Sequence, residues 1–279
     1  MVEKSKDTKS IAVLIPFFRA EAYFAECLAS VLAQSLPPDE VLVADDNSTP
    51  QSRDFLSQFE PQIKVIPLSY QHGPGRARNK LIQEARSHWV AFQDSDDLWH
   101  PNKLERQLGF LLEHPGYAGC HTGVQTFNQQ GPLNTYNNKP ELLTVTDLMH
   151  SSQIPPPSFL VKRECLLAIG LFDTRFKTSE DYDLSIRLVS AGYPIGFIPE
   201  VLTYVRRANH GNISSQGFTV LRHHLKLMYK HHTLFSQQGV PHWRRQFIGQ
   251  SMRQAGGKVG GLAGKALSGM GRLLTYQNE

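Results

Sequence analysis

The chain has 279 residues, which is long for one average domain and short for two, so one main domain with an extension is expected. Its 29 Lys and Arg against 25 Asp and Glu are too balanced to indicate a nucleic-acid partner. Residues 1–10 are polar and charged, unlike a signal peptide, and no apolar run of about 18 residues predicts a transmembrane helix. Three widely spaced cysteines without Cys-x-x-Cys spacing predict neither a disulfide framework nor a zinc site, and they favour a reducing cytoplasm.

Four short apolar runs in the first hundred residues predict strands that are buried on both faces. They are residues 11–15, 41–44, 63–68 and 89–92. Between them, residues 22–34 and 76–86 carry apolar side chains at helical spacing. This alternation predicts an α/β fold with a mostly parallel sheet flanked by helices.

The second half of the chain is less regular. Residues 101–115 and 180–191 predict helices, and residues 117–127, 158–161 and 201–205 resemble strands. After about residue 216 the composition shifts to His, Lys, Arg and Gly. We therefore divide the chain into a polar tail (1–10), a main domain (11–215) and a helical, basic, Gly-rich C-terminal extension (216–279).

The extension contains a possible membrane-binding segment at residues 256–276. Its apolar residues recur at helical spacing, and Lys258, Lys265 and Arg272 stand seven apart on another face, a pattern typical of an interfacial helix. Its glycines weaken an isolated helix. The alternatives are contact with a partner and an ordinary packed tail.

A loop segment follows each predicted strand of the first hundred residues, and every polar, Gly-rich or acidic group there falls at the carboxyl end of a strand. The carboxyl ends of parallel strands share one edge of a sheet, so these groups should form one nucleotide-sized crevice. The groups are Pro16 with Phe17 and Phe18, then Asp45 to Ser48, residues 71–76, and Asp94 to Asp97.

The acidic group after the fourth strand contains Asp94, Asp96 and Asp97. Three carboxylates within four residues repel one another unless a hard cation such as Mg²⁺ or Mn²⁺ lies among them, with phosphate as a further ligand. A solvated acidic turn is the alternative. An EF-hand calcium loop is excluded by Leu98 and Trp99, which occupy positions that would need a ligand and a glycine.

Other groups at the predicted crevice are open to two interpretations. Asp45 and Asp46 either form an Asx turn or accept hydrogen bonds from the imide or ribose of a nucleotide. Residues 16–19 lack glycine, which argues against both an NAD fingerprint and a P-loop. Arg76 and Arg78 lie two apart at a helix start, so we expect only one of them to meet a diphosphate.

Two further groups come from the second half of the chain. Glu180 and Asp181 begin a helix, where acids often complement the helix dipole. A carboxylate there could also deprotonate an acceptor hydroxyl. Arg206, Arg207 and His210 form either a solvated loop or a basic loop that closes over a diphosphate.

Six segments in chain order resemble the successive signatures of family 2 glycosyltransferases with the GT-A fold. They span about residues 10–215 and comprise Ile15–Phe18, Ser30–Ser35, Val43–Ser48, Ala77–Asn79, Phe92–Asp97 and Ser179–Leu184. The resemblance implies an inverting transferase that takes a nucleotide-activated sugar, most often a UDP-sugar, with Mg²⁺ or Mn²⁺. The acceptor implied is a glycan or a lipid-linked molecule in cell-surface polysaccharide or lipopolysaccharide synthesis, at the inner face of the membrane.

The resemblance also implies roles for individual residues. Asp45 and Asp46 would hold uracil and ribose, and Arg78 the diphosphate. Asp96 would bind the donor sugar or ribose, with the metal on Asp97 and a share for Asp96. Asp181 would be the base, with Glu180 as its substitute. The remaining predicted nucleotide-sugar contacts are Pro16, Phe17, Arg76, Asp94 and His210.

Two departures and two rival functions complete the sequence interpretation. Asn47 stands where many relatives have Gly, and Phe18 with Arg19 where they carry Asn, so the donor stays open. A sugar-nucleotide nucleotidyltransferase would need a Gly-rich loop after the first strand, which is missing. A non-catalytic binding or assembly protein would be expected to lose acids such as Asp97 or Asp181, and both are present.

Overall fold

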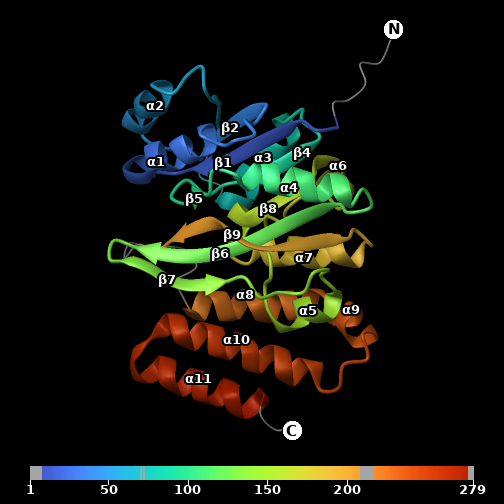
Figure 1. Ribbon diagram of the computed structural model, residues 1–279. Helices are drawn as coiled ribbons and strands as arrows, with labels where there is room; N and C mark the ends of the chain where they lie inside the picture. The colour runs from blue at the N-terminus through green and yellow to red at the C-terminus, as the bar shows by residue number, and fades with distance from the viewer. Residues whose placement is uncertain (1–7, 70, 72, 208–216, 276–279) are drawn as a thin grey trace.

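The computed structural model describes residues 8–69, 71, 73–207 and 217–275, and Figure 1 shows their arrangement. The strands are β1 (Ile11–Phe17), β2 (Glu40–Asp45), β3 (Lys64–Pro67), β4 (Trp89–Phe92), β5 (Leu98–Trp99), β6 (Gly119–Asn128), β7 (Gly131–Tyr136), β8 (Phe159–Lys162) and β9 (Ile195–Arg206). The helices of the main domain are α1 (Glu21–Leu32), α2 (Pro50–Ser57), α3 (Pro74–Glu84), α4 (Lys103–Glu113), α5 (Val145–His150), α6 (Arg163–Ala168) and α7 (Glu180–Ser190), with a 3₁₀ turn at Pro156–Ser158. The C-terminal helices are α8 (Gly217–Lys230), α9 (His232–Gln237), α10 (Trp243–Val259) and α11 (Gly261–Thr275).

The strands within the described ranges form one nine-stranded sheet in the order β3-β2-β1-β4-β8-β6-β9-β5, with β7 paired to β6. The first four strands pair in parallel, as the βαβ pattern predicts. The other half is mixed, because β8 runs antiparallel to both β4 and β6, and β5 runs antiparallel to β9. The predicted parallel sheet is therefore correct for the first half, and the α/β class with flanking helices is confirmed.

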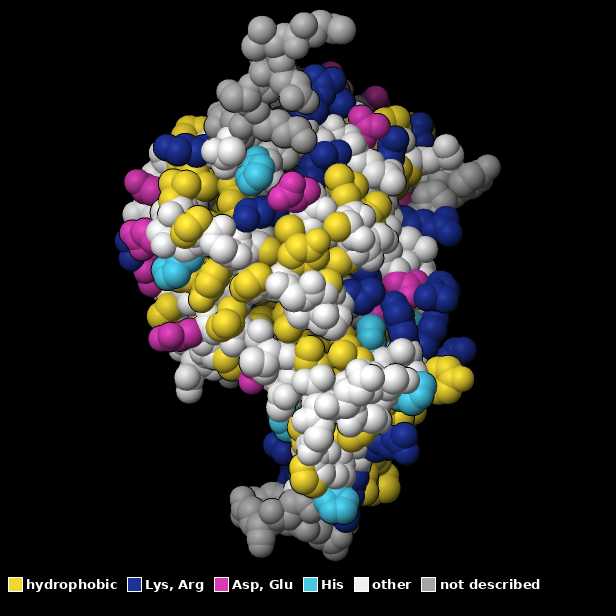
Figure 2. All heavy atoms as spheres, turned by 90° about the vertical axis from the view of Figure 1, so that its right-hand side faces the viewer, with side chains coloured by type: hydrophobic (Ala, Val, Ile, Leu, Met, Phe, Trp, Pro, Cys, Tyr) yellow, Lys and Arg dark blue, Asp and Glu magenta, His cyan; other side chains and the backbone are white. Residues whose placement is uncertain are grey.

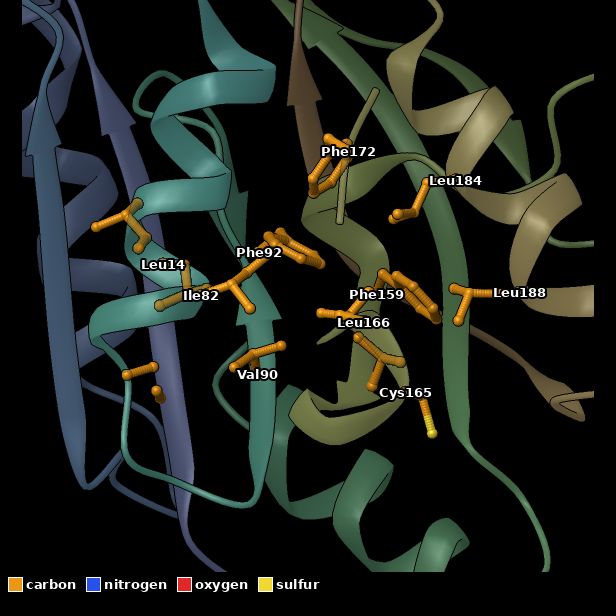
Figure 3. Packing of buried hydrophobic residues seen from close by; sticks show 14 of the residues in the cluster. Leu14, Ile82, Val90, Phe92, Phe159, Cys165, Leu166, Phe172, Leu184 and Leu188 are labelled. Carbon is orange, nitrogen blue, oxygen red and sulfur yellow. The ribbon is translucent and has the colours of Figure 1, made fainter. Parts of the chain in front are cut away.

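Helices cover both faces of the sheet, as expected for strands without polar alternation. On β1, Ala12 and Leu14 pack on the side of α3, α6 and α7, whereas Ile11, Val13 and Ile15 pack on the side of α1, α2 and α4. Figure 3 shows the first of these two cores, in which side chains from β4 and β8 meet those of α7. Rigid packing beneath the sheet edge holds the strand ends in place.

The C-terminal helices lie against the main domain and share a third core with it (Figure 1). Tyr182 and Ile186 of α7 pack in this core with Leu227, Phe235 and Phe247 of the C-terminal helices. Helix α7 thus lies between the sheet and the C-terminal helices. None of the helices in the described ranges combines the length and apolar character needed to span a bilayer.

Close backbone contact between α10 and α11 explains the glycines of the C-terminal segment. A Cβ atom on Gly256 would lie 2.6 Å from the carbonyl oxygen of Gly264, and one on Gly271 would lie 2.5 Å from that of Gly249. The chain turns at Gly260, whose φ of 69° favours glycine. The single interfacial helix predicted over 256–276 is therefore wrong: the segment ends α10 and then forms α11.

We expect Gly256→Ala to lower the free energy of unfolding by about 1 to 3 kcal/mol, because the added Cβ forces α10 away from α11. The matched control is Gly257→Ala, since a Cβ at Gly257 meets no atom within 4 Å. That change should stabilise the helix by up to about 1 kcal/mol. Urea unfolding followed by far-UV circular dichroism measures both. Equal stabilities for the two variants would contradict the close packing.

Candidate active site

The loops that follow the first four strands lie side by side at one edge of the sheet, as predicted. The Asp46 backbone N–H donates to the carbonyl oxygen of Phe17 at 2.9 Å. The Gly73 N–H donates to Asp46 Oδ2 at 2.7 Å, which ties the third loop to the second. The Gln93 N–H donates to the carbonyl oxygen of Leu14 at 3.0 Å.

Asp45 and Asp46 are both buried and bound to backbone. Asp45 Oδ1 accepts the Ser48 N–H at 2.9 Å, and Asp45 Oδ2 pairs with Arg53 at 3.4 Å. This is the Asx-turn arrangement that the sequence offered as one alternative. Contact of either carboxylate with a nucleotide stays a prediction.

The two residues at the end of β1 differ in what they offer a nucleotide. The Phe17 ring is fully buried and packs edge-on against Phe24, with ring centroids 5.2 Å apart. The Phe17 ring therefore belongs to the core and offers a nucleotide no exposed side-chain surface. Pro16 is half-buried at the same strand end, and contact of either residue with the nucleotide stays a prediction.

Arg78 is the central residue of the site, but it does not face the crevice as a free cation. Its Nη2 binds Asp94 Oδ1 at 2.6 Å, and its Nη1 binds Glu180 Oε1 at 2.8 Å. The side chain is only 4% exposed. The guanidinium of Arg78 thus joins the loop after β4 to the start of α7, and its contact with a diphosphate stays a prediction.

Arg76 and His210 are the other predicted basic contacts. Arg76 is exposed in the first turn of α3, so of the two arginines it is the one that reaches solvent. His210 lies outside the described residues. Its neighbour in the predicted basic loop, Arg207, is exposed at the end of the described range.

Asp96 and Asp97 lie next to the end of β9, where both accept hydrogen bonds from Arg206. The backbone N–H of Arg206 donates to Asp97 Oδ1 at 2.8 Å, and Arg206 Nε donates to the carbonyl oxygen of Asp96 at 2.9 Å. Burial, together with repulsion from Asp94, raises the pKa of Asp96 to about 6. Burial and the charge of Asp96 raise the pKa of Asp97 well above its usual value.

The donor set fits a hard divalent cation. Two adjacent carboxylates whose charged forms are disfavoured gain from a nearby cation, and their oxygens are the ligands that Mg²⁺ and Mn²⁺ prefer. No group of three or more His, Cys, Asp or Glu converges as a cage in the part of the chain that the structure describes. In enzymes that act on substrates with phosphate groups, Mg²⁺ is usually bound by one or two carboxylates together with the substrate phosphate.

Asp181 is the residue to which the resemblance assigns the role of base, and this role stays a prediction. It lines a small cavity whose apolar wall includes Phe92, Phe159 and Phe172 (Figure 3 shows these rings). Burial, together with the charge of Glu180, raises the pKa of Asp181 to about 7. The residue before them, Ser179, has a φ of 64°. Strained backbone of this kind is common where a side chain must be aimed at a reaction centre.

A pKa near 7 predicts how transfer depends on pH. The protonated Asp181 cannot accept a proton, so the turnover rate should rise about tenfold per pH unit below pH 7 and level off above it. Initial rates at saturating donor over the range from pH 5.5 to about 8.5 measure this. A rate that stays flat through pH 7 would show that the base is another group.

Asp183, two residues after Asp181, was missed by sequence reasoning. Its carboxylate is fully buried and binds Arg187 at 2.8 Å, Lys230 at 2.6 Å and His231 at 2.8 Å. These partners lower the pKa of Asp183 to about 2 against the opposing effect of burial. The i,i+4 spacing to Arg187 is readable in the sequence, but the contacts with the end of α8 are not.

We expect Asp183→Asn to lower the free energy of unfolding by about 3 to 5 kcal/mol, because buried cations lose their counter-charge. The folded-state pKa lies below the usual value, so this stability is present at neutral pH and is lost as pH falls toward about 2. Urea unfolding measures the change. Glu84→Gln, at an exposed ion pair, is the control and should change little. An Asp183→Asn protein as stable as this control would contradict the assignment.

The acidic strand-end loops, the arginine bridge and a carboxylate at the lining of a small cavity occur here on a mixed α/β sheet. This arrangement agrees with the resemblance to glycosyltransferases of the GT-A fold, and a family model shows the class. The model described as Glycosyl transferase family 2 matches residues 12–166, which is more than half of the chain. The chain belongs to this family.

Two relatives carry names that bear on function. TuaG of Bacillus subtilis (strain 168), named for teichuronic acid biosynthesis, is 34% identical over 209 residues, covering 74% of this chain and 81% of TuaG. The UDP-Glc:alpha-D-GlcNAc-diphosphoundecaprenol beta-1,3-glucosyltransferase WfgD of Escherichia coli is 27% identical over 77% of this chain and 84% of its own.

Two solved structures share the fold. TarS 1–349 of S. aureus in complex with UDP-GlcNAc superposes with a TM-score of 0.64 at 17% identity, covering 95% of this chain and 90% of that one. The mannosyltransferase PcManGT of Pyrobaculum calidifontis, in complex with GDP-Man and Mn²⁺, gives a TM-score of 0.63 at 17% identity, covering 96% and 81%.

Proposed function

We propose that this enzyme is an inverting glycosyltransferase that moves a sugar from a nucleotide diphosphate donor, a UDP-sugar, to a hydroxyl of a glycan or lipid-linked acceptor. The observation that carries the proposal is Asp181. Its carboxylate has a pKa of about 7, lines a cavity and lies next to Glu180, which the Arg78 bridge joins to Asp94. A base close to the donor loops is what a single displacement at an anomeric carbon needs.

Residues of this chain would accept the proton of the acceptor hydroxyl and hold the neighbouring carboxylates in position. Asp181 takes the proton of the acceptor hydroxyl as its oxygen bonds to the anomeric carbon, and the bond from that carbon to the diphosphate breaks with its electron pair leaving on the diphosphate. The neighbouring Glu180 has another partner, because Arg78 Nη1 donates to its Oε1 at 2.8 Å. Arg78 holds Asp94 and Glu180 in fixed positions before substrate arrives.

The nucleotide sugar would lie across the strand-end loops, with base and ribose near Asp45 and Asp46. Asp94 and Asp96 would face the ribose and sugar. Asp97, with Asp96, would hold Mg²⁺ or Mn²⁺, which supplies positive charge to the leaving diphosphate. The bound Mn²⁺ and GDP-Man of PcManGT support a metal-dependent nucleotide-sugar donor in general, and the residue roles are our proposal.

We place the acceptor in cell-surface polysaccharide or lipopolysaccharide synthesis. The names of TuaG and WfgD support this, and the second of them specifies an acceptor linked to a polyprenol diphosphate. An acceptor of that kind lies in a membrane, so we propose that the enzyme works at the inner membrane face and touches it through its C-terminal helices.

A panel of UDP-, GDP-, CMP- and TDP-sugars, each with and without Mn²⁺, tests the donor assignment by thermal shift. A ligand at about 100 times its dissociation constant adds roughly 2.7 kcal/mol to stability. We expect stabilisation by a UDP-sugar only with the metal present. Stabilisation by a sugar of another nucleotide would change the donor, and no stabilisation by any of them would contradict the proposed function.

A further inference from the structure

The C-terminal helices carry a charge opposite to that of the rest of the chain. Residues 217–275 contain nine Lys and Arg and no Asp or Glu, whereas residues 1–216 contain 20 Lys and Arg and 24 Asp and Glu. In Figure 2, Lys and Arg side chains line the right-hand edge at mid-height and recur in the lower part of the molecule, with hydrophobic side chains beside them. Such polarity indicates an anionic partner for this end of the protein.

The same helices expose the most hydrophobic surface. Among the described residues, the four most exposed large hydrophobic side chains are Leu262 (87%), Tyr229 (79%), Leu273 (70%) and Phe218 (63%). All four belong to α8 or α11. Large apolar side chains that stand out from a basic surface are typical of proteins that bind the membrane interface.

Helix α8 combines both features on one face. Phe218, Leu225 and Tyr229 are exposed at positions i, i+7 and i+11, so they lie on the same side of the helix, and Arg222 and Lys226 lie between them. The opposite side, with Val220, His224 and Leu227, is buried against the protein. We call the five exposed residues Phe218, Arg222, Leu225, Lys226 and Tyr229 the α8 face.

Further cations adjoin the α8 face. Lys226 Nζ donates to the carbonyl oxygen of Arg175 at 2.9 Å, and the Arg175 side chain is 73% exposed. Beside them is a surface hollow of about 430 Å³ whose lining includes Arg175, Arg187 and Lys230. Asp173 also lines the hollow, where it neutralises part of the charge.

We propose that the α8 face docks on an anionic phospholipid surface. Two aromatic rings suit the headgroup region, and the adjoining lysines and arginines complement the negative cytoplasmic leaflet. Helix α11 exposes the aliphatic side chains of Leu262 and Leu273 to a larger extent. It contains no aromatic residue, and its exposed cations are Lys265 and Arg272. The proposal rests on the proposed function, because a lipid-linked acceptor gives the enzyme a reason to bind membrane.

Contacts at the end of α8 fix the position of the α8 face relative to Asp181. Lys230, the last residue of α8, and His231 after it bind Asp183 of α7. Asp183 lies within the first turn of the helix that begins with Glu180 and Asp181. A membrane bound to α8 is therefore held at a set position relative to Asp181.

Vesicle co-sedimentation of the full chain tests the proposal, with phosphatidylcholine vesicles and with vesicles that also contain about 30% phosphatidylglycerol. We expect binding to the anionic vesicles alone. The pair Arg222→Gln with Lys226→Gln, and separately the pair Phe218→Ser with Tyr229→Ser, should each weaken this binding by about tenfold or more. Leu112→Ser, at a side chain 50% exposed on α4, and Arg86→Gln, at an exposed arginine after α3, are matched controls that should bind as wild type.

Wild-type binding by both α8 pairs would overturn the proposal, and so would equal binding to neutral vesicles. A loss confined to Leu262→Ser with Leu273→Ser would also overturn it, since that result moves the contact to α11. All vesicle measurements are made without nucleotide sugar, and calorimetry measures donor affinity separately. A chain that binds donor but no vesicles overturns only the docking surface; one that binds vesicles through α8 but no donor overturns only the proposed function.

Discussion

Asp181→Asn is expected to bind the nucleotide sugar about as well as the wild-type enzyme and to transfer sugar about 10² to 10⁴ times more slowly. The lost rate corresponds to roughly 3 to 5 kcal/mol of barrier. The amide keeps the shape of the side chain and an oxygen that can accept the Tyr182 N–H, a bond of 2.9 Å in the structure. It cannot accept the proton of the acceptor hydroxyl.

Calorimetric donor affinity and transfer rate should be measured on one preparation of the variant. Glu180→Gln is the control, because it removes a neighbouring carboxylate that is bound to Arg78. Near wild-type transfer by Asp181→Asn would pass the base role to Glu180. Loss of donor binding in that variant would make Asp181 a binding residue.

Asp97→Asn is expected to abolish metal-dependent donor binding and turnover together, with the fold intact. The amide oxygen can still accept the Arg206 N–H, which donates to Asp97 Oδ1 at 2.8 Å, so the end of β9 keeps its anchor. The substitution removes one negative charge from the metal ligands, so the cation is bound more weakly. The diphosphate then faces the remaining carboxylates without enough positive charge between them.

Donor titrations with and without Mn²⁺ measure the effect, and circular dichroism confirms that the variant is folded. The two aspartate variants separate the roles, since one should lose binding and the other only chemistry. Full activity of Asp97→Asn at ordinary Mn²⁺ concentrations would show that the metal lies on other residues.

The sequence predicts the first half of the fold because its signals are local. Each parallel strand is a short apolar run, each helix between them has its own spacing, and polar groups mark the strand ends. The position of Asp45, Asp94 and Asp97 at one sheet edge follows from that pattern alone. The sequence therefore predicts that these acidic residues lie close together, whatever ligand they bind.

What the sequence could not provide depends on contacts between distant residues. Glu180 lies 102 residues from Arg78, so nothing local predicts that they form an ion pair. The antiparallel position of β8 depends likewise on the path of the intervening chain. In the sequence alone, the glycines of the C-terminal segment predict only a weaker helix. Their packing role depends on the close approach of the α10 and α11 backbones, as at Gly256 and Gly264.

The Asp94–Arg78–Glu180 bridge has a thermodynamic consequence for the enzyme before any sugar moves. Arg78 and Asp94 both contribute to the field that sets the pKa of Asp181. Linkage is reciprocal: if the donor changes the proton affinity of Asp181, the protonation of Asp181 must change donor affinity by the same factor. Donor affinity measured on either side of pH 7, in the absence of acceptor, therefore reports the coupling between the donor and the proton of Asp181. Asp181→Asn should remove the part of the pH dependence that belongs to Asp181.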